Sequence, residues 1–315
     1  MSRQRGVALI TVLLVVALVS VVCTGLVLRQ QLAIRSTGNQ LLVRQAQYYA
    51  EGGELLGKAI LQRDLREGDP RQPLDHLGEP WANPKLSFPL DEGGELRLRI
   101  VDLSGRFNLN SLAAGGETTE LAQQRLRRLL LQLQLPLEYA ERLRDWLDQD
   151  QDGSGASGAE DAQYLLLQPP YRTGPGLIRE VSELRLLLGM KEAEYRRLLP
   201  FVSALPVEAR LNVNTASALV LSTLADNLTP EAAQALVLAR GAEGFRSLAA
   251  FTAQPALAGM GELGDQLTVG SQYFLARSEV RLGERRRLLT SLSRREPDGR
   301  GSEVARGLGH DGRGP

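Results

Sequence analysis

The sequence predicts an α+β protein in which a long N-terminal helix packs on a small antiparallel sheet, with a large all-α domain inserted into that sheet. An uncharged apolar run opens the chain, and two segments of alternating apolar and polar residues lie far apart in it. Between these segments the sequence is rich in Leu, Ala, Arg and Glu at helical spacing. We therefore expect the inserted domain over residues 105–267.

The apolar run over residues 7–28 carries no charged side chain. At ~1.5 Å of rise per residue it spans ~33 Å, enough to cross a hydrocarbon core of ~30 Å. No small-residue cleavage pattern follows it, which argues against a secretory signal peptide. Arg3 and Arg5 predict a cytoplasmic N-terminus by the positive-inside tendency. The run therefore predicts a single-pass membrane helix.

The helix is expected to continue beyond the membrane over residues 29–67. No proline occurs between Val7 and Asp69, and apolar residues recur at roughly helical spacing as far as Leu61. One helix is therefore predicted from Val7 to about residue 66.

The predicted sheet comes from two separate parts of the chain, residues 68–104 and 268–295. Residues 95–102 alternate apolar and charged side chains, which is typical of a half-buried strand. Residues 273–282 and 285–294 predict a hairpin that turns at Gly283-Glu284, whereas the proline-rich residues 69–89 predict a surface loop. The Gly- and Arg-rich tail, residues 296–315, is expected to be disordered.

The composition excludes several classes of protein. The chain has 37 Lys+Arg and 37 Asp+Glu, so it lacks the positive surplus that a nucleic-acid clamp needs. One Cys and two His cannot supply a disulfide framework or a usual zinc site. His76 lies in the proline-rich stretch and His310 in the tail, which are poor settings for the base of a catalytic triad. We expect a protein that is not an enzyme and binds no nucleic acid.

The predicted insert contains an internal repeat. The segment Arg106-Phe107-Asn108-Leu109-Asn110 matches Arg210-Leu211-Asn212-Val213-Asn214, and a helical stretch follows each copy. Asn and Ser/Thr side chains in both copies are suited to cap the first N–H groups of a helix, and capping alone would explain them. The second copy also resembles a helix-hairpin-helix or SAM-like element.

An acidic loop lies in the first half of the insert. Residues 138–161 contain eight acidic side chains against two arginines. The pattern D-x-D-x-D-G that ends at Gly153 resembles the first half of an EF-hand, but the twelfth position, where an EF-hand needs Glu, is Ala159. Crowded carboxylates repel unless a cation joins them, so we expect a calcium loop of another type, with a solvated acidic loop as the alternative. The predicted ligands of one or two structural Ca²⁺ ions are Asp148, Asp150, Asp152, Glu160 and Asp161.

The N-terminal leader, residues 1–6, resembles the processing site of type IV prepilins: a short basic segment ends at Gly6, and the apolar helix begins at Val7. The resemblance implies that prepilin peptidase cleaves between Gly6 and Val7 and that Val7 is then N-methylated. Most members of that family have Glu as the fifth mature residue, where this chain has Thr11. A carboxylate at membrane depth is costly unless it is paired. In the family it is taken to pair with the amine of the preceding subunit, so Thr11 marks a subunit with none ahead of it, at a filament tip.

Taken together, these features resemble the K-type minor pseudopilins of type II secretion, the general secretion pathway protein K family, over about residues 6–295. The resemblance also rests on residues 145–148, 158–161 and 212–217. It implies a pilin-like fold whose insert contains SAM-like elements and binds calcium. It further implies a tip subunit of the periplasmic pseudopilus, needed for pseudopilus assembly and for export of folded exoproteins across the outer membrane.

The same resemblance implies partners and a location. The partners are the I-type and J-type minor pseudopilins, the major pseudopilin, prepilin peptidase and the secreted exoproteins. The location is the bacterial inner membrane, with the C-terminal domain in the periplasm.

Two other classes share parts of this pattern. A minor pilin of a type IV pilus would have the same leader and helix, but such subunits seldom carry this insert. A membrane-anchored DNA-uptake protein would use the helix-hairpin-helix element, yet Ala242, Glu243 and a lone Arg240 make a poor phosphate cradle.

Overall fold

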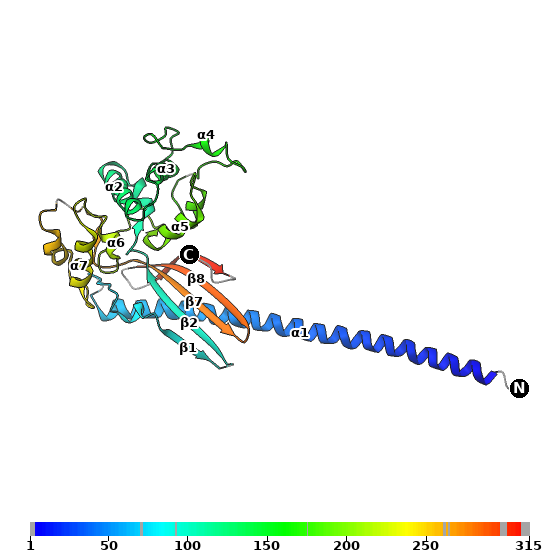
Figure 1. Ribbon diagram of the computed structural model, residues 1–315. Coiled ribbons are helices and arrows are strands. Elements are labelled where there is room, and N and C mark those ends of the chain that lie inside the picture. The colour runs from blue at the N-terminus through cyan, green and yellow to red at the C-terminus, as the bar shows by residue number, and fades with distance from the viewer. Residues whose placement is uncertain are drawn as a thin grey trace.

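Helix α1 (Gln4–Glu67) projects far beyond the rest of the molecule (Figure 1). The structure, a computed structural model, describes residues 4–69, 72–91, 93–174, 176–260, 263, 265–296 and 301–309. Residues 8–44 of α1 are exposed, and burial begins near Ala46, which is 2% exposed. In this described part α1 is the one helix long and apolar enough to cross a membrane. The prediction of one helix to about residue 66 is confirmed, while residues 1–3 of the leader lie outside the described residues.

A five-stranded antiparallel sheet packs along the C-terminal part of α1 (Figure 1). Its strands, in the order β1-β2-β7-β8-β9, are β1 (Leu86–Leu90), β2 (Gly94–Asp102), β7 (Tyr273–Leu282), β8 (Arg285–Arg295) and β9 (Gly301–Gly309). Strand β2 confirms the strand predicted over residues 95–102. The predicted hairpin is also confirmed, because Leu282 pairs with Arg285 across Gly283-Glu284.

The contact between α1 and the sheet is apolar and close. Leu98 of β2 and Phe274 of β7 pack with Leu61 of α1 and with Trp81 of the short helix η1 (Pro80–Ala82). The rings of Trp81 and Phe274 meet edge to face, with centroids 5.2 Å apart. A Cβ at Gly53 of α1 would clash with side chains of β2 and β7, so glycine allows the helix to approach the sheet.

Two sequence-based predictions about this sheet are wrong. Residues 86–89, expected in a loop, belong to edge strand β1, where Pro89 is tolerated because an edge strand leaves N–H positions unpaired. The tail, expected to be disordered, forms β9 over residues 301–309 and pairs with β8. Arg306 also lies 3.2 Å from the carboxylate of Glu54 in α1. The rest of that tail prediction, residues 297–300 and 310–315, lies outside the described residues.

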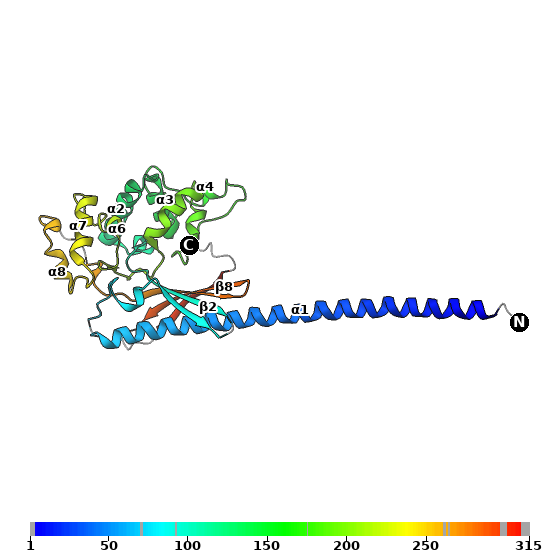
Figure 2. The same ribbon diagram turned by 60° about the horizontal axis from the view of Figure 1, so that its bottom comes forward.

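The chain between β2 and β7 lies on the other side of the sheet from α1 (Figure 2). It forms two modules, each opened and closed by a two-residue strand. The first module contains β3 (Phe107–Asn108), η2 (Leu109–Ala113), α2 (Gly116–Gln132), α3 (Glu138–Leu147), α4 (Asp161–Tyr164), η3 (Val181–Leu186), α5 (Glu192–Leu198), η4 (Leu199–Phe201) and β4 (Val202–Ser203). The second module contains β5 (Leu211–Asn212), α6 (Ala218–Leu221), α7 (Pro230–Arg240), α8 (Leu248–Thr252), η5 (Pro255–Leu257) and β6 (Leu267–Thr268).

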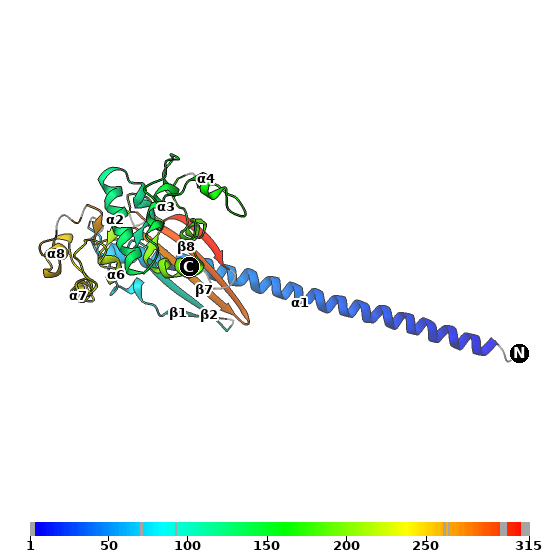
Figure 3. The same ribbon diagram turned by 45° about the horizontal axis from the view of Figure 1, so that its top comes forward.

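Each module has its own hydrophobic core, one built from residues 107–202 and one from residues 213–267. Figure 3 shows the corresponding separation of α3 and α4 from α7 and α8. The expectation of an all-α insert is wrong in one respect. Strand β3 pairs in parallel with β4, and β5 pairs in parallel with β6.

Candidate functional site

The acidic loop joins α3 to α4 in the first module. Helix α3 ends at Leu147 with Asp148 as its C-cap, and the chain returns at Glu160, the N-cap of α4. Just outside these two ends, the buried rings of Trp146 and Tyr164 meet edge to face with centroids 5.3 Å apart. This contact holds the start and the end of the loop side by side.

Three carboxylates converge where the loop ends meet. One ligand oxygen from each of Asp145, Asp148 and Glu160 lies within 4.8 Å of the others. Asp145 is 1% exposed and Glu160 is 5% exposed. Both oxygens of Glu160 and Oδ1 of Asp148 are buried without a hydrogen-bond partner. Buried carboxylate oxygens normally have donors, so this cluster leaves an unusual concentration of acceptor capacity unused.

The same cluster disfavours negative charge. Burial, followed by the charges of Asp145 and Asp148, raises the pKa of Glu160 to about 7. Burial, followed by the charges of Asp150 and Asp145, raises the pKa of Asp148 to about 6. A bound cation would reverse these effects because it offsets both the desolvation and the repulsion.

The backbone of the loop closes around Asp145. The amide N–H groups of Ser154 and Ala159 donate to its two carboxylate oxygens, at 2.9 and 2.7 Å. Gly158 lies against the same carboxylate, and a Cβ there would clash with Asp145 and with the backbone of Ser154. Glu141 adds a second attachment, since its carboxylate accepts from the amide of Ser157 at 2.9 Å. The loop is therefore built around the cluster.

The structure brings together only part of the predicted ligand set. Asp148 and Glu160 lie in the cluster, whereas Asp150 and Asp152 are exposed and linked to each other by a 2.9 Å bond from the Asp152 amide. Asp161 instead accepts from the amide and hydroxyl of Thr173, at 3.0 and 2.9 Å. The charges of Asp150 and Asp161 still act on Glu160, so both residues lie near the cluster.

Asp145 is the cluster member that the sequence-based ligand set lacks. It precedes Asp148 by three residues, the spacing that puts two side chains on one face of a helix. This spacing is the sequence signal by which Asp145 could have been identified as a further ligand. The donor set consists of hard oxygen atoms, and Ca²⁺ takes about six to eight of these in flexible geometry. Because three such atoms lack donors, the residues present fit a calcium ion.

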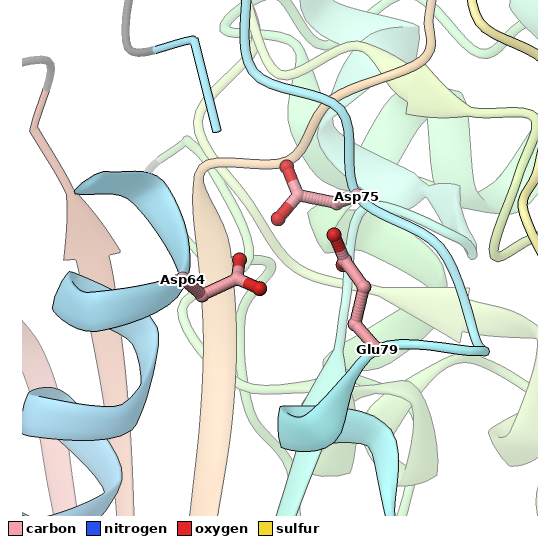
Figure 4. A group of neighbouring side chains, drawn as sticks. All are labelled: Asp64, Asp75 and Glu79. Carbon is pink, nitrogen blue, oxygen red and sulfur yellow. The ribbon is translucent and has the colours of Figure 1, made fainter. Parts of the chain in front are cut away.

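A second carboxylate cluster lies at the junction of α1, the proline-rich loop and the sheet. The carboxylates of Asp64, Asp75 and Glu79 point toward one another (Figure 4). Arg295 compensates them: its Nη2 lies 2.5 Å from Asp75, and its Nη1 lies 3.4 Å from Asp64. Burial, with the charges of Glu79 and Asp75, raises the pKa of Asp64 to about 7. This cluster therefore already contains a cation, and it ties the helix to the sheet.

The internal repeat seen in the sequence is structural as well. In the first copy, the amide of Asn110 donates to Oδ1 of Asn108 at 3.2 Å, and the Asn110 side chain both accepts from the amide of Ile178 and donates to its carbonyl. In the second copy, Asn214 makes the same two-way contact with the backbone of Phe245. The paired asparagines therefore do more than cap: each pair clamps a distant loop of its own module.

The resemblance of the second copy to a DNA-binding hairpin does not extend to its basic residue. Arg240 is 9% exposed, and its Nη1 donates to the carbonyls of Val213 and Ala216, at 3.2 and 2.6 Å. Its guanidinium therefore stabilises the module from within.

The predicted processing site lies in the N-terminal part of α1. Gly6 and Val7 are within the helix, and the hydroxyl of Thr11 donates to the carbonyl of Ala8 at 2.9 Å. This local bond satisfies the Thr11 hydroxyl within its own helix.

Comparisons with known proteins agree with the two-module description. Two family models, both described as type II secretion system protein K, match residues 105–207 and residues 211–270. The chain is 52% identical to the type II secretion system protein K of Pseudomonas aeruginosa, over 98% of this chain and 94% of that protein. It is 38% identical to the protein K of Klebsiella pneumoniae, over 93% of each chain.

A solved structure is similar over most of its length. The chain matches a chain of the GspK–GspI–GspJ complex of the type 2 secretion system of enterotoxigenic Escherichia coli. The TM-score is 0.78 at 30% identity, over 87% of this chain and 99% of that one. From the identity to curated relatives, the two family models and this fold, we conclude that the chain belongs to the type II secretion system protein K family and is a minor pseudopilin.

Proposed function

We propose that this chain stands at the tip of a periplasmic pseudopilus, bound to I-type and J-type minor pseudopilins. The observation that carries the proposal is the similarity to a chain of the GspK–GspI–GspJ complex. A pseudopilus with this tip assembles from the major pseudopilin and exports folded exoproteins across the outer membrane.

The shape of the chain supports a tip position. The two modules lie over the sheet on the side away from α1 (Figure 2). In a shaft, subunits stack with their helices side by side, so each subunit needs room above it for the next. A module pair of this size would fill that room, whereas at the tip it meets no further subunit.

The N-terminal region supports anchoring in the inner membrane before assembly. The exposed apolar part of α1 crosses the membrane once, with the leader in the cytoplasm and the sheet and modules in the periplasm. Prepilin peptidase removes residues 1–6, and Val7 becomes the methylated N-terminus. Thr11 suits a subunit that has no preceding amine to pair with a carboxylate.

The acidic loop is proposed to bind Ca²⁺ as a structural ion. Asp145, Asp148 and Glu160 would hold it, with Asp150, Asp152 and Asp161 nearby as further acidic groups. The ion supplies charge compensation, which holds the loop closed on the end of α3. The first module, which contains this loop, and the second module correspond to the SAM-like elements of a single insert in a pilin-like fold.

The alternative roles are less well supported. A minor pilin of a type IV pilus shares the helix and sheet but not the two modules that match protein K. A DNA-uptake protein would need an accessible basic face on the hairpin, and Arg240 is buried there.

Immunogold labelling of pseudopili that carry an epitope-tagged copy of this chain tests the proposal. We expect label at one end of each filament, with a tagged major pseudopilin labelling the whole shaft as the control. Label from this chain along the shaft would contradict the tip position.

A further inference from the structure

Two arginines stand directly opposite each other in the five-stranded sheet. Arg99 of β2 pairs with Arg277 of β7 in the antiparallel register. Their neighbours Leu98 and Ala276 pack against α1, so the two arginines project from the other face of the sheet, on the side of the modules (Figure 2). Like charges directly opposite each other destabilise a sheet, so this pair is unfavourable in the isolated chain.

The acidic side chains on the same face are engaged elsewhere. Glu95 lies 2.7 Å from Arg97, and Glu279 lies within 2.9 Å of one arginine of β7 and one of β8. Within the described part of the chain, neither Arg99 nor Arg277 has a hydrogen bond or an ion pair. The two positive charges therefore face each other without a described carboxylate between them.

Arg277 is partly withdrawn from water as well. It is half-buried, and its Nε is buried without a hydrogen-bond partner. Burial, followed by the positive charge of Arg99, lowers its pKa, and no carboxylate opposes this effect. The guanidinium still remains charged at neutral pH, because the ordinary pKa of arginine is far above 7. A partly desolvated cation without a partner is costly, and a bound anion would remove that cost.

A third arginine, Arg106 at the start of the first module, adds to the positive potential. Burial lowers its pKa, followed by the charge of Arg277, and Asp102 opposes this less strongly than Arg277 acts. The carboxylate of Asp102 already accepts from two hydroxyls and an amide. Asp102 therefore offsets only part of the repulsion at Arg106.

A phospholipid headgroup cannot reach this surface. Gly57 of α1 packs against Leu98 and Ala276, the strand neighbours of the two arginines. It follows Leu28, the last residue of the predicted membrane span, by 29 residues, which places it ~43 Å further along the helix. The headgroup layer extends only ~5–8 Å beyond the hydrocarbon core. The anion that fits here is therefore a carboxylate group of a protein.

We propose that Arg99 and Arg277 bind an acidic segment of a partner protein, and that Arg106 adds to the attraction. A guanidinium presents N–H donors in a geometry that matches a carboxylate. An acidic segment would neutralise both charges of the cross-strand pair, so a pair that is unfavourable in the isolated chain becomes favourable in the complex. Binding here does not depend on where the chain stands in a pseudopilus, so it can hold or fail separately from the proposed tip position.

Fluorescence anisotropy tests the proposal, with a labelled peptide of six glutamates as the probe. The full-length chain, in micelles of an uncharged detergent and at constant calcium, is titrated into the peptide. We expect saturable binding that weakens with added salt, and no binding of a matched peptide of glutamines. Absence of saturable binding, or equal binding of both peptides, would overturn the proposal.

Loss of one arginine should weaken this binding. Arg99 is exposed, so Arg99→Gln should keep the fold and raise the Kd roughly tenfold, as expected for one lost charge-assisted contact. Arg246→Gln removes an arginine of the second module whose side chain is 83% exposed, and this matched control should bind like the wild type. A Kd that is unchanged in Arg99→Gln, or that rises equally in both variants, would also overturn the proposal.

A charge reversal links the peptide to the cross-strand pair. Arg99→Glu should abolish peptide binding and raise the melting temperature of the free chain, because opposite charges then face each other across β2 and β7. Peptide binding that persists in this variant would count against the site.

A soluble phospholipid tests the choice of occupant. Dihexanoyl phosphatidylglycerol should displace the labelled peptide only at higher concentrations than unlabelled peptide does. Displacement at lower concentrations would identify a lipid headgroup as the occupant and overturn the assignment to an acidic protein segment.

Discussion

The carboxylates of Asp145 and Glu160 approach within 4.8 Å from opposite ends of the acidic loop, yet only one of them has donors. Asp145 accepts from two loop amides, whereas both oxygens of Glu160 are buried without a partner. The closed loop therefore supplies hydrogen-bond donors to Asp145 and leaves Glu160 buried without any. A cation between them would remove the penalty, so the folded loop and the bound ion should depend on each other.

Calcium should stabilise the metal-free chain. A ligand that binds only the folded state at a hundredfold excess over its Kd adds ~2.7 kcal/mol to the free energy of unfolding. Magnesium should add less, because it dehydrates reluctantly and needs stricter octahedral geometry. Differential scanning calorimetry of the full chain in detergent, with and without chelator, measures this. A melting temperature that changes with neither calcium nor chelator would favour the alternative interpretation, a solvated acidic loop that binds no ion.

Substitutions should show whether calcium binds to the cluster of Asp145, Asp148 and Glu160 or to the ligand set predicted from the sequence. Glu160→Gln should remove most of the calcium response and leave the metal-free chain as stable as the wild type or more so, because a buried unpaired carboxylate is lost. Asp161→Asn should keep the calcium response and lower stability in both conditions, because it weakens the contact with Thr173. Calcium titrations of the two variants decide this. If only Asp161→Asn loses the response, the ligand set from sequence is the better one.

Stability should depend on pH through Asp64. Burial and neighbouring charges raise its pKa from an ordinary value of 3.8 to about 7, so between about pH 4 and 7 the folded chain holds a proton that the unfolded chain has released. The free energy of unfolding should therefore fall as pH rises through this window. Asp64→Asn should flatten the fall, although Asp75, Glu79 and Asp102 contribute with the same sign.

The matched control for Asp64 is Glu67→Gln, one turn further along α1, where the side chain is 70% exposed. Melting temperatures measured at constant calcium from pH 4 to 8 should show the wild-type slope for this control. If the melting temperature of Asp64→Asn changes with pH as steeply as that of the wild type, Asp64 is excluded as the source of the pH dependence.

Processing should depend on Gly6. Gly6→Ala should block cleavage and leave a precursor six residues heavier in the inner membrane. Intact-mass measurement of the membrane fraction distinguishes the two forms, and Ser2→Ala serves as a leader variant that should still be cleaved. A mature chain that begins at a residue other than Val7 would contradict the prepilin-like prediction.

A carboxylate at position 11 should be harmful at a tip. Thr11→Glu would place an acidic side chain at membrane depth without a preceding amine, at a cost of up to roughly 2.5–3.5 kcal/mol, the insertion-scale value for a charged residue at the helix centre. Exoprotein secretion should fall, while Thr11→Val, which is uncharged and similar in size, should secrete normally. Normal secretion by Thr11→Glu would show that the missing charge does not assign this subunit its position.

The sequence by itself determined the features that depend on local pattern. The apolar and helical periodicity predicted α1, because a 3.6-residue repeat needs no distant partner to be recognised. Alternation and a glycine at the turn predicted the β7–β8 hairpin for the same reason. The repeated Asn pairs revealed the internal repeat of the insert, since similar local chemistry recurs at each copy, but not that each copy opens a module with its own core.

Only the tertiary structure decided which distant residues meet. Strand β9 forms because β8 offers it an open edge and Glu54 offers Arg306 a partner, although its own Gly-rich sequence favours disorder. Asp145 joins Glu160 because Trp146 packs on Tyr164. Arg99 faces Arg277 because β2 pairs with β7. Each contact depends on how segments far apart in the chain pack together, which local periodicity does not encode.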